Sequence, residues 1–226
     1  MLLSSRSKSK TVSIAARDST LSQAQVVEVL ELLKEHYPKV SFDNTWLATA
    51  GDRDQETSLR NLDKTDFFTR DLDEALLAGR VQVTIHSAKD LPEPLKKGIS
   101  VIALTHALDP RDMLVPSKRY SDAKLPKCPV IGTSSARRER TILDKYPRAI
   151  IKDIRGSIPH RLEQLDANNY DAVVMPECAL LRLNITERPR TPLHGAVAPL
   201  QGQLAITART NDSEMANLFA CIDTRE

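Results

Sequence analysis

The sequence predicts an α/β protein of two lobes, each with a mixed, mostly parallel sheet, and a cleft between the lobes. Short apolar strands alternate with amphipathic helices over residues 11–104, which is typical of βαβ units. The same rhythm returns after residue 130 without repeating the first sequence. Polar and cationic residues follow the strands at their carboxyl ends, where open α/β sheets bind ligands.

The composition is that of an ordinary soluble globular protein. Of the 226 residues, 41% are hydrophobic and 27% are charged, and no apolar run approaches the ~20 residues of a membrane helix. A net charge of +2 and few aromatic residues do not favour nucleic-acid binding. Three widely spaced cysteines, Cys128, Cys178 and Cys221, form no metal-binding pattern and suit free thiols in a reducing compartment. We expect a cytoplasmic monomer without a metal, with a frayed N-terminus over residues 1–10.

The first half of the chain alternates strands with helices. We expect strands over residues 11–17, 42–50, 81–85 and 99–104, and helices over residues 21–37 and 67–77. The apolar stripes that face the sheet are Val26, Val27, Leu30 and Leu33 in the first helix, and Phe68, Leu72, Ala75 and Leu76 in the second. Residues 51–66 carry much charge and little periodicity, so they predict an exposed, mobile loop.

The second half repeats this alternation. We expect strands over residues 130–135, 149–154, 171–175 and 204–208, helices over residues 136–146 and 213–221 and from Ser157 onward, and a loop over residues 195–203. Ile142 and Leu143 are expected to face inward. Residues 1–104 and 203–226 are assigned to lobe 1, and residues 105–202 to lobe 2.

The strand at residues 81–85 leads into a cluster of polar groups. Val81, Val83 and Ile85 alternate with polar residues, which predicts a strand with one buried face. The chain then reads HSAKDLP, so His86, Ser87, Lys89 and Asp90 lie at the strand's carboxyl end. We expect Asp90 to be ionised among cations and either to stabilise a developing positive charge or to move protons on a nitrogen. An ion pair with Lys89, or a helix cap, is the structural alternative.

Cationic and hydroxyl residues follow the other strands. Arg17 and Ser19 stand between the first strand and its helix, where backbone N–H groups bind anions, although Ser19 could simply cap that helix. Arg137 and Arg138 enter the first turn of the next lobe's helix, where cations oppose the helix dipole unless an anion is present. Arg155 ends a strand, and Arg161 follows it. Together they predict a site for a small polyanion, and for each arginine alone solvation or a salt bridge is the alternative.

Five motifs in order resemble those of the porphobilinogen deaminase (hydroxymethylbilane synthase) family. They are IAARDSTLSQAQ, HSAKDLP, DPRD at residues 109–112, GTSSARRER and IRGSIPHRLEQLD. The resemblance covers nearly the whole chain. It implies two lobes like those of type II periplasmic binding proteins and a small third domain.

The resemblance also implies a reaction and its residues. The family deaminates porphobilinogen and joins four units into the linear tetrapyrrole hydroxymethylbilane, for porphyrin and haem biosynthesis, from a dipyrromethane primer. Asp90 matches the family's catalytic aspartate. The matches to cofactor- or substrate-binding positions are Arg17, Ser19, Ser87, Lys89, Thr133, Ser134, Ser135, Arg137, Arg138, Arg155, Gly156, Arg161 and Gln201.

The chain also departs from the family's pattern. LDKTDFF lacks the family's glycines near Lys64, the family's GQGA is LQGQ here, and MPECALLRL differs from the family's small-residue run. We expect no third domain after Cys221, and none of the three cysteines lies in a motif matching the primer's thioether anchor. A fragment, a short form primed differently, and an inactive form remain open. The rival function is a non-catalytic binder of anionic pyrroles or other small polycarboxylates. A transcriptional effector-binding domain would lack its helix-turn-helix segment here.

Overall fold

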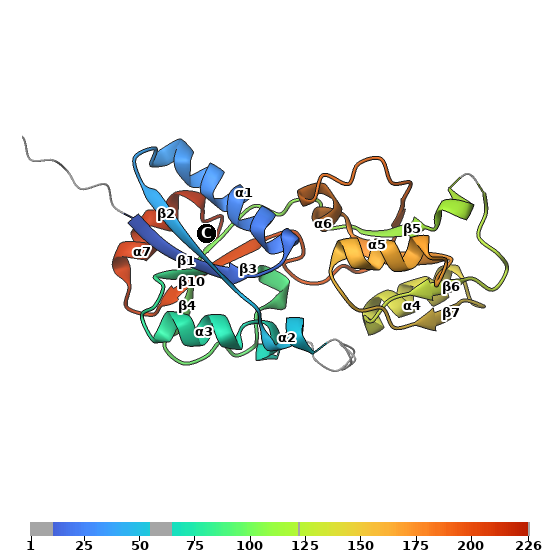
Figure 1. Ribbon diagram of the computed structural model, residues 1–226, viewed down its shortest axis with the longest axis horizontal. Helices are drawn as coiled ribbons and strands as arrows, with labels where there is room; N and C mark the ends of the chain where they lie inside the picture. Colours follow the sequence, from blue (N-terminus) through green and yellow to red (C-terminus); the bar gives the residue numbers. More distant parts are fainter. Residues whose placement is uncertain (1–10, 55–64, 122, 226) are drawn as a thin grey trace, which may run out of the picture.

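The computed structural model describes residues 11–54, 65–121 and 123–225, and shows two lobes side by side (Figure 1). Lobe 1 surrounds a five-stranded sheet. Its strands are β1 (Thr11–Arg17), β2 (Ser41–Leu47), β3 (Val83–Ser87), β4 (Ile99–Leu104) and β10 (Leu204–Arg209). Its helices are α1 (Thr20–His36), α2 (Ala50–Arg53), α3 (Arg70–Leu77) and α7 (Ser213–Phe219), with short 3₁₀ turns at Asp66–Phe68, Ala88–Asp90 and Ala220–Ile222.

Lobe 2 surrounds a second five-stranded sheet. Its strands are β5 (Asp112–Pro116), β6 (Val130–Gly132), β7 (Ile150–Lys152), β8 (Ala172–Pro176) and β9 (Thr191–Leu193). Its helices are α4 (Ala136–Lys145), α5 (Ile158–Asp166) and α6 (Glu177–Arg182), and a 3₁₀ turn covers Lys118–Tyr120. The boundaries that we expect between the lobes, near residues 104 and 203, stay a prediction.

Both sheets have the same topology. The strand orders are β2-β1-β3-β10-β4 and β7-β6-β8-β5-β9. In each sheet four strands run in one direction, and the strand next to the edge, β10 or β5, pairs antiparallel with both neighbours. Parallel strands bring their carboxyl ends to one edge, so each sheet offers one edge to a ligand.

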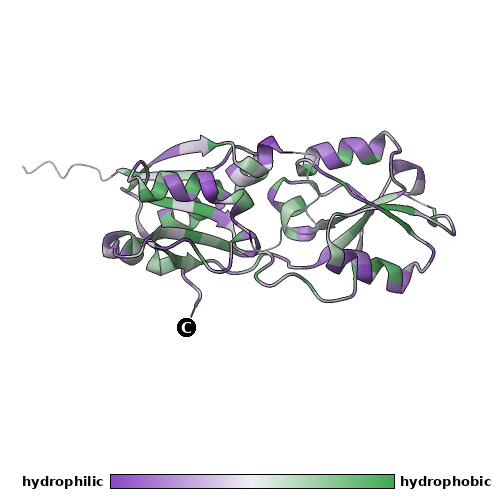
Figure 2. Cartoon of the chain, turned by 90° about the horizontal axis from the view of Figure 1, so that it is seen from below, coloured by the Kyte–Doolittle hydropathy of each residue, from purple (hydrophilic) through white to green (hydrophobic). Residues whose placement is uncertain are grey.

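Helices cover both faces of each sheet. In lobe 1, α1 and α7 pack on one face through Val29 and Phe219, and α3 packs on the other through Leu72. In lobe 2, α5 and α6 share one face and α4 covers the other through Ile142. Figure 2 shows the same division, with hydrophobic strands inside and hydrophilic helix surfaces outside. Burial of these apolar stripes is the main stabilising term for the helices.

Two expected core positions are wrong. Val27 is 53% exposed and Leu143 is 37% exposed. Val26, Leu30 and Leu33 pack on the core as expected, and Val29 rather than Val27 completes the buried stripe of α1. In α3, the buried residues Leu72, Ala75 and Leu76 confirm the expected stripe, although the helix begins at Arg70 because the preceding residues form a 3₁₀ turn.

The sequence did not predict three elements of lobe 2. Strand β5 is buried on both faces, so it lacks the alternation that marks a half-buried strand. Helix α6 starts directly after β8, without a polar cap. Strand β9 is three residues long and contains Pro192, which suits only an edge position. The expected loop at residues 51–66 begins with α2, and residues 55–64 with Lys64 lie outside the described residues, as do residues 1–10.

Two connecting segments join the lobes and lie against each other. The Thr105 amide donates to Leu204 O (3.0 Å), and the Leu108 amide donates to Gly202 O (3.2 Å). Gly202 has φ +96°, and a Cβ there would lie 2.0 Å from Leu108 O. This close backbone contact therefore requires glycine.

Gly202→Ala is expected to lower the free energy of unfolding by about 2–3 kcal/mol, because a left-handed conformation and a backbone clash act together. Urea denaturation measures the loss. Gly79→Ala is the matched control, since Gly79 has φ +69° and an added Cβ would meet nothing within 4 Å. Gly79→Ala should lower the free energy of unfolding by about 1 kcal/mol. Equal losses at both positions would contradict the conclusion that the close backbone contact between Gly202 and Leu108 requires glycine.

A buried acid in α3 gives a second test in this lobe. Asp73 accepts a hydrogen bond from Thr69 Oγ1 (3.0 Å), and burial raises the pKa of Asp73 to about 6 despite that bond and the charge of Lys96. Its folded pKa exceeds the unfolded value of about 3.9, so ionisation destabilises the fold increasingly from about pH 4 to pH 6. Asp73→Asn should therefore raise the melting temperature at pH 7. At pH 3.5 the gain should vanish, and a gain that persists there would contradict the assignment.

Helices α1 and α6 bring the lobes together at a second place. Arg182 Nε donates to Glu28 Oε2 (2.7 Å), and Arg182 Nη2 donates to Glu28 Oε1 (2.9 Å) and to Gly202 O (2.8 Å). The Arg182 side chain is 4% exposed. This bidentate ion pair holds α1 against α6 and against the connecting segment that contains Gly202.

Among the described residues, no helix combines the length and apolar character that crossing a bilayer requires.

Candidate functional site

A cavity lies at the carboxyl ends of β1 and β3, beside the start of α1. Its lining includes four motif residues, Arg17, Ser19, Ser87 and Asp90, together with His86 and Phe68. The strands hold these side chains at fixed positions because β1 and β3 are neighbours in the sheet. The cavity therefore has a rigid floor and both signs of charge.

Arg17 is held in place from two sides. Its guanidinium forms an ion pair with Asp52 of α2 and lies 4.4 Å from the ring centroid of Phe68. Burial opposes ionisation of Asp52, but the hydrogen bond and charge of Arg17 outweigh it and hold the pKa of Asp52 below its usual value. The salt-bridge alternative thus applies to Arg17, which is half-buried at the cavity.

The two serines of the cavity already have hydrogen bonds. Ser19 is the N-cap of α1 and accepts from the Ser22 amide (3.2 Å). Ser87 Oγ accepts from Gln25 Nε2 (2.8 Å). Ser19 therefore caps α1, as the structural alternative proposed. Because its oxygen acts as the acceptor in that bond, the Ser19 hydroxyl hydrogen stays available to the cavity.

Asp90 and Lys89 sit on the 3₁₀ turn after β3 and point to different partners. Lys89 Nζ donates to Gln201 Oε1 (3.1 Å), whereas Asp90 makes no hydrogen bond or ion pair within the described ranges. Burial and the charge of Arg138 lower the pKa of Lys89. The alternative of a Lys89–Asp90 ion pair is therefore wrong, and Asp90 keeps both carboxylate oxygens for the cavity.

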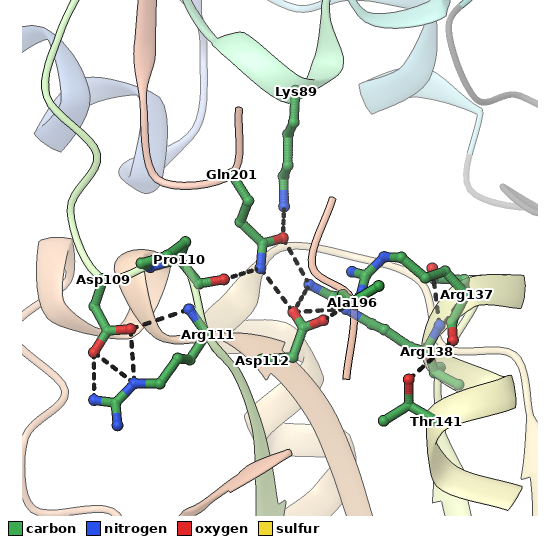
Figure 3. A network of polar contacts seen from close by, with 12 residues as sticks. Lys89, Asp109, Pro110, Arg111, Asp112, Arg137, Arg138, Thr141, Ala196 and Gln201 are labelled. Atoms are coloured by element: carbon green, nitrogen blue, oxygen red, sulfur yellow. Dashed lines mark hydrogen bonds and ion pairs between the residues drawn. The ribbon is translucent and has the colours of Figure 1, made fainter. Parts of the chain in front are cut away.

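Gln201 connects Lys89 of lobe 1 to a charged network in lobe 2 (Figure 3). Its Nε2 donates to Pro110 O (2.6 Å) and Asp112 Oδ1 (2.9 Å). These two acceptors orient the amide, so that its oxygen faces Lys89 and Arg138. Gln201 is 2% exposed, and it is the residue through which the two lobes share a polar contact at this point.

Asp112 supplies the negative charge that was expected beside Arg137 and Arg138 at the start of α4. Arg137 Nη1 lies 2.7 Å from Asp112 Oδ2, and Arg138 donates through Nε (3.0 Å) and Nη2 (2.7 Å) to Asp112 Oδ1. Burial opposes ionisation of Asp112, but the charge and hydrogen bonds of Arg138 lower its pKa below the usual value. A protein carboxylate thus satisfies both arginines in this structure.

The three hydroxyl residues before α4 shape this end of the sheet. Ser134 Oγ donates to Ile154 O (2.8 Å) and accepts from the Ile154 amide (3.0 Å), which joins the ends of β6 and β7. Ser135 caps α4, and Thr133 Oγ1 accepts from the Ser135 amide (3.3 Å). All three have structural hydrogen bonds.

Arg155 and Arg161 form a third group of cations, next to the start of α5. Arg155 Nη2 donates to Asp54 O (2.7 Å) in lobe 1. Arg161 Nε donates to Gly156 O (2.9 Å), which is accessible because Gly156 adopts φ +99°. Burial, with the charges of Arg138 and Arg155, lowers the pKa of Arg161 to about 10. No carboxylate pairs with Arg161 in the described part of the chain, so its terminal nitrogens are available to a ligand.

In the structure most of the predicted residues fall into three groups. The first lines the cavity, the second is the Gln201 network, and the third is Arg155 with Arg161, whose charge acts on Arg138 and Asp90. The expected set of binding residues left out Asp112 and His86. Asp112 lay in the DPRD motif, and the two arginines at a helix start signalled a missing anion. His86 lay inside the HSAKDLP motif, but the sequence could not show that it faces the cavity.

Solved structures show the same fold. The BenM effector binding domain with its effector benzoate aligns with a TM-score of 0.56 at 14% identity, over 94% of this chain and 90% of that one. A Streptococcus pneumoniae amino acid ABC transporter substrate-binding protein bound to L-arginine aligns with a TM-score of 0.53 at 12% identity, over 94% and 86%. The predicted fold class, two lobes of the type II periplasmic-binding kind, is confirmed.

Relatives with named functions are much closer in sequence. A "Probable porphobilinogen deaminase" of Chlamydia pneumoniae is 39% identical over 92% of this chain and 88% of its own length. The "Porphobilinogen deaminase" of Fusobacterium nucleatum is 35% identical over 94% of this chain and 73% of its own length. The family model described as "Porphobilinogen deaminase, dipyromethane cofactor binding domain" matches residues 12–217. This chain therefore belongs to the porphobilinogen deaminase family.

Proposed function

We propose that this protein is a porphobilinogen deaminase, a transferase that deaminates porphobilinogen and joins four units into hydroxymethylbilane in the cytoplasm. The observation that carries the proposal is Asp90. It is a carboxylate without a hydrogen-bonding partner in the described residues, on a short turn beside the cavity that Arg17 also lines, and its charge acts on Lys89 and Arg161. Relatives bearing the name of this activity support the same conclusion.

The charge of the cleft suits the substrate. Each porphobilinogen carries an acetate and a propionate, so the growing product is a polycarboxylate. Arg137 and Arg138 both pair with the single carboxylate of Asp112, Lys89 lies near Arg138, and Arg161 has no carboxylate partner among the described residues. This excess of positive charge supports a role for these residues in binding substrate carboxylates.

Asp90 suits the step in which ammonia leaves. Loss of ammonia from the aminomethyl group places positive charge on the pyrrole nitrogen, and a fixed carboxylate stabilises that charge by accepting the N–H hydrogen bond. Neither carboxylate oxygen of Asp90 accepts a hydrogen bond from another described residue, so no hydrogen bond within the protein has to break before Asp90 accepts one from the substrate. We assign it the catalytic role, and Ser87 and Lys89 the role of orienting the substrate beside it.

The same residues fit a dipyrromethane, which also carries acetate and propionate groups and would serve as the starting chain for coupling. The carboxylate of Asp90 can accept from the pyrrole N–H groups of two linked pyrroles, and the available nitrogens of Arg161 can donate to their acidic side chains. Arg17, Ser19, Thr133, Ser134, Ser135, Arg155, Gly156 and Gln201 would shape and charge the walls around it. Of the three cysteines, Cys178 is buried near Lys89, and Cys128 and Cys221 are exposed.

Two measurements test the proposal. Incubation of the purified protein with porphobilinogen should release ammonia and yield hydroxymethylbilane, detected as uroporphyrin after cyclisation and oxidation. Tight binding of porphobilinogen without release of ammonia would instead support the non-catalytic binder. Intact mass under denaturing conditions, before and after incubation, reports a covalent dipyrromethane as a two-pyrrole excess, and a Cys178→Ala variant reports whether that thiol holds it.

A further inference from the structure

His86 is a cavity residue that no step described above uses. It lies on β3, four residues before Asp90, and it belongs to the lining of the cavity together with Arg17, Ser87 and Asp90, with its imidazole close enough to Arg17 to sense that charge. The residue is 6% exposed. Burial, with the positive charge of Arg17, lowers the pKa of His86 to about 4, so the imidazole is neutral at pH 7. A neutral imidazole has one donor nitrogen and one acceptor nitrogen.

Two buried threonines determine which nitrogen carries the hydrogen. His86 Nε2 lies 2.8 Å from Thr84 Oγ1, which also hydrogen-bonds to Thr207 Oγ1 of β10. Neither threonine hydroxyl has another hydrogen bond within the described residues, and both side chains are buried. If Nε2 donated to Thr84, and Thr84 to Thr207, the Thr207 hydrogen would be buried without an acceptor, which costs about 1–3 kcal/mol.

The opposite direction gives both threonine hydrogens an acceptor and leaves only the imidazole hydrogen to be accepted from the cavity. Thr207 donates to Thr84, Thr84 donates to His86 Nε2, and the hydrogen of the imidazole then sits on Nδ1. No described residue accepts from Nδ1, and His86 lines the cavity. Ser87 Oγ accepts from Gln25, so its own hydrogen is likewise available there. Two neutral donors thus stand beside the cation of Arg17.

We propose that His86 is a substrate-binding residue that donates from Nδ1–H to a carboxylate of the pyrrole substrate, with its tautomer fixed by Thr84 and Thr207. The donor set of Arg17, Ser87 and His86 holds the carboxylate while Asp90 faces the pyrrole nitrogen. The inference rests on the proposed function and adds a specificity residue to it.

The tautomer is tested without any activity. In protein labelled with ¹⁵N in its histidine rings, long-range ¹H–¹⁵N correlation at pH 7 should show the Nδ1–H pattern for His86, assigned by its absence in His86→Asn. Thr84→Val removes the donor to Nε2 and should introduce the Nε2–H pattern. An Nε2–H pattern in the parent protein would overturn the inference.

A matched pair of variants tests the contact. The amide of His86→Asn lies about where Nδ1 lies, whereas His86→Gln reaches toward Nε2 and leaves the Nδ1 position empty. His86→Gln should raise the KM for porphobilinogen about tenfold with little change in kcat, because a hydrogen bond to a charged group is lost. His86→Asn should stay within about threefold of the parent. Equal KM values with an active parent would overturn this inference alone, whereas an inactive, non-binding parent would overturn the proposed function with it.

Discussion

Asp90→Asn should lower kcat for hydroxymethylbilane formation by at least about 100-fold and leave the melting temperature within a degree or two. The loss is large because a neutral amide cannot stabilise a positive charge that develops on the pyrrole nitrogen. The stability should hold because Asp90 has no hydrogen bond or ion pair in the described part of the chain that the change would break. Steady-state kinetics and thermal melts on the same preparation measure both quantities.

Asp18→Asn is the control for that variant. Asp18 follows β1 as Asp90 follows β3, but it is exposed, its only described side-chain contact is with Gln23 Nε2 (3.4 Å), and it does not line the cavity. Its kcat should stay within about twofold of the parent. If Asp90→Asn keeps more than a tenth of the parent's kcat, the catalytic assignment of Asp90 is wrong.

Asp112→Asn should lower the free energy of unfolding at pH 7 by about 3 kcal/mol, which is the scale for removing one partner of a buried ion pair. The Asp112 side chain is 5% exposed, and the change would remove the carboxylate that pairs with Arg137 and with Arg138, which is 10% exposed and lies near Lys89. Urea denaturation measures the loss. Asp109→Asn in the same DPRD motif is the control, because Asp109 pairs with Arg111, which is 59% exposed, and the change should cost little.

The loss in Asp112→Asn should also depend on pH in a defined direction. The folded-state pKa of Asp112 is depressed, so the carboxylate stabilises the fold above its unfolded pKa of about 3.9 and loses that effect as the pH falls further. The gap between parent and variant should therefore be full at pH 7 and narrow below about pH 4. A gap that is equally large at pH 3 would mean that charge is not what Asp112 contributes.

The strand ends could be predicted from the sequence, but the pairing of their charges could not. Periodicity places Arg17, Lys89 and Arg137 at the edges of two sheets because strand length and turn residues are local properties. That Asp52 pairs with Arg17, and Asp112 with Arg138, depends on contacts between residues 26–35 positions apart, which no local pattern encodes. The same holds for His86, since its role depends on Thr207 of a strand 121 residues later.

The interior place of β10 also affects how the protein is made. This strand pairs with both β3 and β4, yet it comes from residues 204–209, about 100 residues after β4 ends at Leu104. During synthesis on the ribosome, the edges of β3 and β4 that pair with β10 therefore stay unpaired while every strand of lobe 2, from Asp112 to Leu193, is synthesised. Lobe 2 can close first, and lobe 1 closes only when β10 inserts between strands that are already present. Pairing over so long a stretch of chain is slow, which makes the open edges of β3 and β4 the part of the nascent protein most exposed to aggregation.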